Sequence, residues 1–125
     1  MTGILLVTHD GVAEALCRQV EIILDRLPSL TTVSIAAEAD VDAAEQTLRE
    51  AMAAARDEQG LVILTDLPGA TPHNLAARAA AEANDRLVSG LSLPMLLKVI
   101  SHAEQPPDVL ARLASEGGYQ GIIQA

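Results

Sequence analysis

The sequence predicts an α/β fold, a three-layer sandwich with a mainly parallel sheet. Short apolar runs of strand length alternate with longer segments whose apolar residues recur every three or four positions, and the connections between them are short. The 125 residues are 50% hydrophobic, which is enough for one core. We therefore expect a single domain over residues 1–125.

Strands are expected where apolar or β-branched runs stop at turn-forming residues. The first run ends at His9-Asp10-Gly11 and the third at Asp66-Leu67-Pro68-Gly69-Ala70. Runs that are apolar at every position are typical of strands buried on both faces, as in a parallel sheet. The predicted strands cover 3–8, 31–36, 61–65 and 87–91, and the tail at 119–125, with Ile122 and Ile123, is predicted to be an edge strand.

Two helices are expected before the third strand. The first has apolar residues at helical spacing over 12–27 and stops before Pro28. The second begins at Asp42, with Glu45 three residues later in a pattern that resembles a capping box, and ends at Gly60.

Three further helices follow the third strand. The first of these has Thr71 as its N-cap and Pro72 at its first helical position. Proline stands at the start of the other two as well. The three helices are predicted over 71–83, 94–100 and 106–118, the last closed by Gly117-Gly118.

Composition excludes several classes of function. The chain carries 8 Lys and Arg against 17 Asp and Glu, a net charge of −9, and its one aromatic residue is Tyr119, so nucleic-acid binding is not expected. Its apolar runs are far shorter than the roughly 20 residues of a membrane span, and the N-terminus lacks the pattern of a signal peptide. Together with the lone Cys17, these features predict a soluble cytoplasmic protein.

The candidate site lies where the first and third strands end, because ligands bind beyond the carboxyl ends of strands in such sheets. His9 ends the first strand, Asp66 follows the third, and Thr71 begins the next helix. If the two strands are neighbours, an imidazole and a carboxylate meet beside a helix N-terminus. Taken singly, each residue has an ordinary structural explanation as a surface histidine, a turn former or a helix start.

Together these residues describe a phosphorylatable histidine. A carboxylate bonded to one ring N–H fixes the imidazole tautomer, so that the other nitrogen presents its lone pair as a nucleophile. Backbone N–H groups at a helix start bind phosphate oxygens. We therefore expect His9 as the nucleophile, Asp66 as its orienting partner, and Gly69, Ala70 and Thr71 as the phosphate-binding residues, with no metal and no cofactor.

Three ordered blocks also resemble a known family, the IIA component of the mannose-type (mannose/fructose/sorbose) bacterial phosphoenolpyruvate-dependent sugar phosphotransferase system. The blocks are ILLVTHDGVAEAL at 4–16, DLPGATPHN at 66–74 and VSGLSLPMLL at 88–97. The resemblance implies that His9 accepts a phosphoryl group from HPr on Nε2, with Asp66 bonded to Nδ1, and passes it to a IIB component for sugar uptake. It also implies a homodimer that exchanges its C-terminal edge strand and meets the membrane only through transporter components.

The chain departs from the pattern of that family at three positions. Pro68 replaces a common aromatic residue, Ala70 replaces a frequent glycine, and His73 stands where an apolar or aromatic residue often follows the proline. Pro68 and His73 are expected at the rim of the site, where they bear on partner recognition more than on chemistry. His73 also raises the alternatives of a second phosphate site or of a metal site with His9 and Asp66.

Other functions stay open at this point. The same phosphorylation could control a partner in a stand-alone regulatory protein. A receiver-like module would instead be phosphorylated on Asp66, although such a module needs an acidic cluster after its first strand and a lysine after its last, where this chain offers Thr8-His9 and only Lys98. The related IIA-like domain of dihydroxyacetone kinase systems is a further variant of the carrier.

Overall fold

The computed structural model describes residues 1–80 and 82–125, so Ala81, near the predicted end of the third helix, lies outside them. The described residues form a four-stranded parallel sheet in the order β2-β1-β3-β4. β1 pairs with both β2 and β3, which confirms that the first and third strands are neighbours. The strands are β1 (Gly3–His9), β2 (Thr31–Ile35), β3 (Leu61–Thr65) and β4 (Asp85–Val88).

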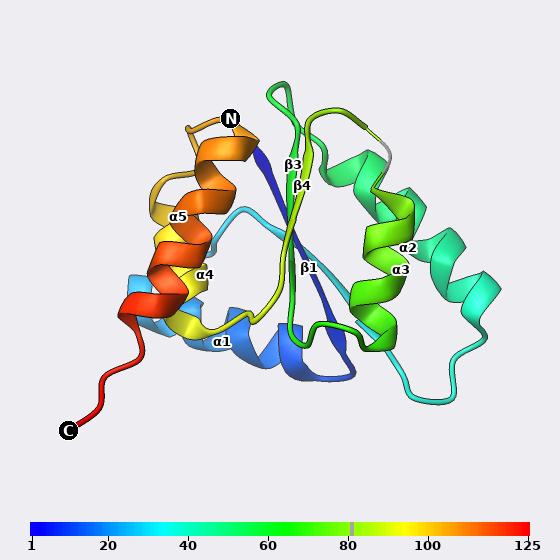
Figure 1. The fold of residues 1–125 in the computed structure, drawn as a ribbon, viewed down its shortest axis with the longest axis horizontal. Helices are drawn as coiled ribbons and strands as arrows, with labels where there is room; N and C mark the ends of the chain where they lie inside the picture. The colour runs from blue at the N-terminus through cyan, green and yellow to red at the C-terminus, as the bar shows by residue number, and fades with distance from the viewer. Residues whose placement is uncertain (81) are drawn as a thin grey trace.

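Helices cover both faces of this sheet, which confirms the three-layer α/β sandwich (Figure 1). α1, α4 and α5 lie on one face, and α2 and α3 lie on the other. No described helix is both long and apolar enough to cross a membrane. The helices are α1 (Val12–Leu24), α2 (Val41–Ala55), α3 (Thr71–Ala79), α4 (Leu93–Ser101) and α5 (Pro107–Gln120).

The central strands β1 and β3 divide the core into two layers by the alternation of their side chains. Leu6 and Leu64 pack toward α1, α4 and α5, whereas Leu5 and Ile63 pack toward α2 and α3. All four side chains are fully buried. The sheet edge that carries His9 and Asp66 is therefore held on a rigid, doubly covered frame.

Several predicted helix ends are wrong, because backbone conformation and side-chain caps decide where a helix begins and ends, and the spacing of apolar residues does not reveal them. α1 stops at Leu24, since Asp25 takes a left-handed conformation with φ 52°, and Leu27 is left exposed. α2 begins one residue before Asp42, because the Asp40 side chain accepts the N–H of Ala43 at 3.3 Å. It ends at Ala55, well before Gly60.

β4 and α4 are also shifted from their predicted positions. β4 begins at Asp85 because a two-pronged ion pair with Arg56, at 3.0 and 2.8 Å, lets this carboxylate be buried at the strand start. α4 begins at Leu93, where the Ser92 hydroxyl caps the helix by accepting the N–H of Met95. The first shift depends on a partner distant in the chain, and the second on a local side-chain cap; the apolar runs reveal neither.

The predicted C-terminal edge strand is not formed within this chain. α5 continues through Gly117 and Gly118 to Gln120, because these glycines serve close packing against α4: a Cβ on Gly117 would lie 2.7 Å from Cβ of Lys98. Residues 122–125 pair with none of the described strands, and Ile122 and Ile123 are exposed. In Figure 1 the tail runs away from the sheet.

Candidate functional site

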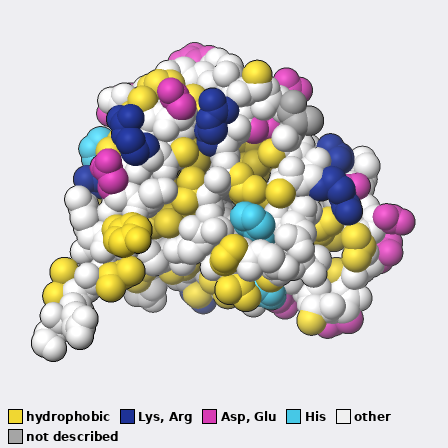
Figure 2. Space-filling model, in the orientation of Figure 1, with side chains coloured by type: hydrophobic (Ala, Val, Ile, Leu, Met, Phe, Trp, Pro, Cys, Tyr) yellow, Lys and Arg dark blue, Asp and Glu magenta, His cyan; other side chains and the backbone are white. Residues whose placement is uncertain are grey.

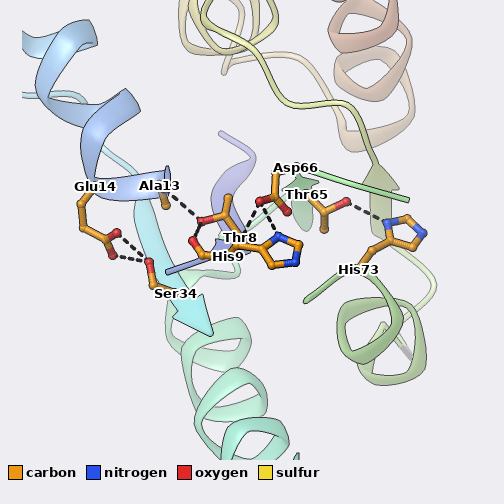
Figure 3. Close-up of polar contacts among 8 residues, drawn as sticks. All are labelled: Thr8, His9, Ala13, Glu14, Ser34, Thr65, Asp66 and His73. Atoms are coloured by element: carbon orange, nitrogen blue, oxygen red, sulfur yellow. Dashed lines mark hydrogen bonds and ion pairs between the residues drawn. The ribbon is translucent and has the colours of Figure 1, made fainter. Parts of the chain in front are cut away.

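His9 and Asp66 meet at the carboxyl edge of the sheet, as the sequence predicts. His9 is the last residue of β1, and Asp66 directly follows β3. Asp66 Oδ2 lies 2.8 Å from His9 Nδ1 and also accepts the backbone N–H of His9 at 3.0 Å (Figure 3). The parallel pairing of β1 with β3 brings the two residues together although they are far apart in sequence.

The Asp66 carboxylate is held ionised by these two bonds. Burial alone raises the pKa of Asp66, but the backbone and ring N–H bonds from His9 outweigh that effect, and the pKa lies below its ordinary value. Asp66 Oδ1 is buried without a hydrogen-bond partner among the described residues, so the bonds of this carboxylate run through Oδ2 to His9.

This geometry selects one tautomer of His9. An ionised carboxylate only accepts hydrogen bonds, so His9 Nδ1 must carry the proton that it shares with Asp66. In the neutral ring Nε2 then holds a lone pair. The His9 side chain is 46% exposed and that of Asp66 only 14%, so the orienting group is covered while the ring remains accessible. The arrangement is suited to a nucleophilic imidazole.

The turn that positions His9 is fixed by neighbours that the sequence pattern does not single out. The hydroxyl of buried Thr8 donates to the carbonyl of His9 at 2.8 Å and accepts the N–H of Ala13 at 2.9 Å. Gly11 makes the sharp entry into α1 with φ 86°, a conformation that favours glycine. The Ser34 hydroxyl donates to the Glu14 carboxylate, and this bond lowers the pKa of Glu14 (Figure 3).

The start of α3 differs in detail from the prediction. Ala70, not Thr71, is the N-cap, and it has no side-chain cap; Thr71 is the first helical residue and is exposed. The N–H of Ala70 donates to the carbonyl of Leu67 at 3.4 Å. The N–H groups of Gly69 and Thr71 have no protein acceptor among the described residues. Two of the three predicted phosphate-binding residues thus present free backbone donors.

A hollow of about 260 Å³ lies between His9 and the start of α3. Its remaining wall is the segment from Ile35 to Ala44, which follows β2 and enters α2. Sequence reasoning missed this wall because the residues of the segment that line the hollow are all apolar. The position of this segment in the chain could have revealed the wall, because β2 is parallel to β1 and its carboxyl end reaches the same sheet edge.

His73 lies on α3 near the same edge, but it contacts neither His9 nor Asp66 by a hydrogen bond. Its Nδ1 lies 2.8 Å from Oγ1 of Thr65, the last residue of β3 (Figure 3). Among the described residues, no three His, Cys, Asp or Glu side chains gather closely enough to hold a metal ion. His9, Asp66 and His73 therefore do not form the alternative metal site.

Comparisons with known proteins identify the family to which this chain belongs. The family model EIIA-man, described as the PTS system fructose IIA component, matches residues 3–111. The PTS system mannose-specific EIIAB component of Escherichia coli strain K12 is 24% identical over 123 residues, which cover 96% of this chain and 38% of that protein. This chain therefore spans well under half the length of that relative.

Solved structures share the fold over nearly the whole chain. The mannose/sorbose specific IIA subunit from Enterococcus faecalis superposes with a TM-score of 0.90 at 25% identity, covering 99% of this chain and 94% of that one. The phosphotransferase system component EIIA from Streptococcus agalactiae superposes with a TM-score of 0.87 at 22% identity, covering 99% and 97%. Because the family model matches most of its residues, this chain belongs to the EIIA-man family of PTS system IIA components.

Proposed function

We propose that this chain is a single-domain phosphohistidine carrier that takes a phosphoryl group from HPr onto His9 and passes it to a IIB component for sugar uptake. The observation that carries the proposal is the 2.8 Å contact between His9 Nδ1 and Asp66 Oδ2, which leaves Nε2 as a free nucleophile at the open edge of the sheet. Membership of the EIIA-man family supports the same chemistry.

The transfer step needs only groups of this chain and the donor. The lone pair on His9 Nε2 attacks phosphorus, the P–N bond to the donor imidazole breaks, and the donor nitrogen recovers its electron pair. The phosphorylated ring of His9 keeps its Nδ1 proton, and the adjacent carboxylate of Asp66 stabilises the positive charge on that ring. The chain is a phosphotransferase component in this sense, with a covalent intermediate.

Stabilisation of the phosphoryl group has to be local, because the chain carries a net charge of −9. In this proposal the free N–H groups of Gly69 and Thr71, at the positive end of α3, bind its oxygens. Ala70 contributes to phosphate binding by forming the turn that presents these two N–H groups. Figure 2 shows histidine side chains bordered by hydrophobic ones on one face, a surface suited to a protein partner.

A labelling experiment tests the proposal. Incubation with labelled phosphoenolpyruvate, enzyme I and HPr is expected to place one phosphoryl group on the chain, at His9, in a bond that is labile to acid and stable to alkali. Peptide mapping by mass spectrometry identifies the residue. A label on Asp66, in an alkali-labile acyl phosphate, would contradict the carrier and favour the receiver-like alternative.

We propose further that the carrier is a homodimer in which the tail of each subunit adds to the sheet of the other. Among the described strands, β4 stands at the edge of the sheet with its outer side unpaired, and hydrophobic side chains gather where it lies between α5 and α3 (Figure 2). A groove of about 410 Å³ begins at Val88, the last residue of β4, and runs along the loop to α4 and the end of α5 as far as Ile122. The exposed Ile122 and Ile123 are suited to fill such an edge in a second copy.

Deletion of residues 122–125 is expected to convert the dimer into a monomer while leaving the fold intact, because these residues contribute no strand within their own chain. Light scattering measures the mass, and circular dichroism checks that the helices persist. A variant with Gln124 and Ala125 alone removed keeps both isoleucines and should remain a dimer. A monomeric full chain, or a dimer that survives the longer deletion, would contradict the exchange.

A further inference from the structure

His73 makes one specific contact that nothing in the proposed chemistry uses. Its Nδ1 lies 2.8 Å from Oγ1 of Thr65, across the loop that carries Asp66. Thr65 ends β3 and is fully buried, whereas His73 is in the first turn of α3 and is half-buried. Figure 3 shows the bond running from the strand end to the helix, beside the pair of His9 and Asp66. The contact therefore links a buried hydroxyl at the strand end to a half-buried imidazole on the helix.

Burial decides which atom donates in this bond. The Thr65 hydroxyl has one proton, and His73 Nδ1 is the only hydrogen-bond partner of Oγ1 among the described residues. If Nδ1 carried a proton and donated it to Oγ1, the hydroxyl proton would be left unpaired in the core, which costs free energy. If the hydroxyl donates to the lone pair on Nδ1, both groups are satisfied. The second arrangement is the more stable, and in the neutral ring it places the proton of His73 on Nε2.

Asp66, the residue after Thr65, fixes the opposite tautomer in His9. Asp66 only accepts, so it puts the proton of His9 on Nδ1 and leaves Nε2 with a lone pair. We propose that the consecutive residues Thr65 and Asp66 hold two imidazoles in opposite tautomers, making His9 the nucleophile and His73 an N–H donor that cannot accept a phosphoryl group. The lone pair of His73 is on Nδ1, where the buried hydroxyl covers it.

We propose that the outward N–H of His73 donates a hydrogen bond to a docked protein. In Figure 3 Nε2 of His73 points away from Thr65 and from His9, so its N–H is not directed at a phosphoryl group on His9. This docking role rests on the proposed function, since it needs a protein partner that brings an acceptor oxygen to His73. The tautomer of His73 does not rest on it, because it follows from the buried hydroxyl alone.

Nuclear magnetic resonance of the ¹⁵N-labelled full chain tests the tautomers directly. Two-bond correlations between ring protons and ring nitrogens, recorded at a pH where the imidazoles are neutral, distinguish a protonated Nδ1 from a protonated Nε2. We expect the Nε2–H pattern for His73 and the Nδ1–H pattern for His9. An Nδ1–H pattern for His73 would overturn the inference, whatever the result of phosphorylation experiments.

The Thr65→Val variant tests the chemical consequence. Valine keeps the shape and loses the hydroxyl, so Nδ1 of His73 can take up the proton and expose a lone pair on Nε2. Phosphoramidate, a small phosphoryl donor, then has two acceptors: its P–N bond breaks, ammonia leaves, and a new bond forms to the ring nitrogen that carries the lone pair. We expect label on His9 alone in the native chain and on both His9 and His73 in the variant.

Thr2→Val is the matched control, because Thr2 is also buried but its hydroxyl donates to the carbonyl of Gln105 at the other end of the sheet. It should leave the His73 spectrum and the single label unchanged. A folded Thr65→Val chain that keeps the Nε2–H pattern and shows no second label would overturn the role of Thr65. Absence of label on His9 in the native chain would instead contradict the proposed function, and the spectrum of His73 would still decide the tautomer.

The docking role has its own kinetic signature. His73→Phe removes the donor and is expected to raise KM for HPr several-fold with kcat little changed, since His73 does not touch the reacting atoms. His73→Gln places an amide N–H near the position of Nε2 and should restore much of the affinity. A change confined to kcat, or no change in either constant, would contradict a role in partner docking.

Discussion

The His9→Gln variant is expected to take up no phosphoryl group from HPr. A glutamine amide can still donate a hydrogen bond toward Asp66, so the loop after β3 should keep its position. Its nitrogen lone pair is delocalised into the carbonyl and is not nucleophilic, so no P–N bond forms. Loss of label should be complete, to the level of a sample without HPr. Gel autoradiography or intact-mass measurement follows the reaction.

His102→Gln is the matched control for this experiment. His102 lies at the C-terminal end of α4, where its Nδ1 contacts the carbonyl of Lys98 at 2.9 Å, and it belongs to none of the contacts around His9. Its replacement should leave labelling at the native level. Label that persists in His9→Gln at the native rate would remove His9 from the reaction.

The second large effect is expected from Asp66→Asn. The asparagine amide can donate to Nδ1 of His9 as well as accept from it, so the ring is free to carry its proton on Nε2, where it blocks the nucleophile. The neutral amide also loses the charge that stabilises a phosphorylated ring. A wrong histidine tautomer costs about 10⁴-fold in a serine protease, and we expect a loss of about 100-fold or more in the transfer rate here.

Rapid-quench kinetics with phosphorylated HPr measures this rate, and imidazole spectra report whether His9 has changed tautomer. Asp57→Asn, in the exposed turn before β3 at the opposite end of the sheet, is the control and should transfer at the native rate. An Asp66→Asn chain that transfers at the native rate would show that the carboxylate is not needed to orient His9.

The lowered pKa of Asp66 also fixes the sign of one pH effect. Because the folded-state pKa lies below the ordinary value, ionised Asp66 stabilises the fold at pH values above that ordinary value. This contribution is lost as the pH falls through the folded-state pKa. The bond between Asp66 and His9 is thus kept in place throughout the neutral range in which transfer would occur.

The sequence by itself determined the parts of this protein that depend on continuous apolar runs. The runs at β1 and β3 predict buried parallel strands, and parallel strands end at one edge, so the sequence predicts that His9 and Asp66 lie at the same edge. That they meet there depends on the direct pairing of β1 with β3, which the sheet topology decided. The helix start near Thr71 followed from the Thr71-Pro72 pair, although the N-cap is Ala70. These features rest on burial and chain direction, which local sequence encodes.

Tertiary structure alone decided the features that depend on a partner distant in the chain. Asp85 begins β4 because Arg56 neutralises it, and Gly117 continues α5 because α4 leaves no room for a Cβ. Residues 122–125 pair with none of the described strands, so the predicted edge strand is not formed here. Thr65 meets His73 for the same reason: the proton of a buried hydroxyl must find an acceptor, and only the folded chain determines which one is within reach.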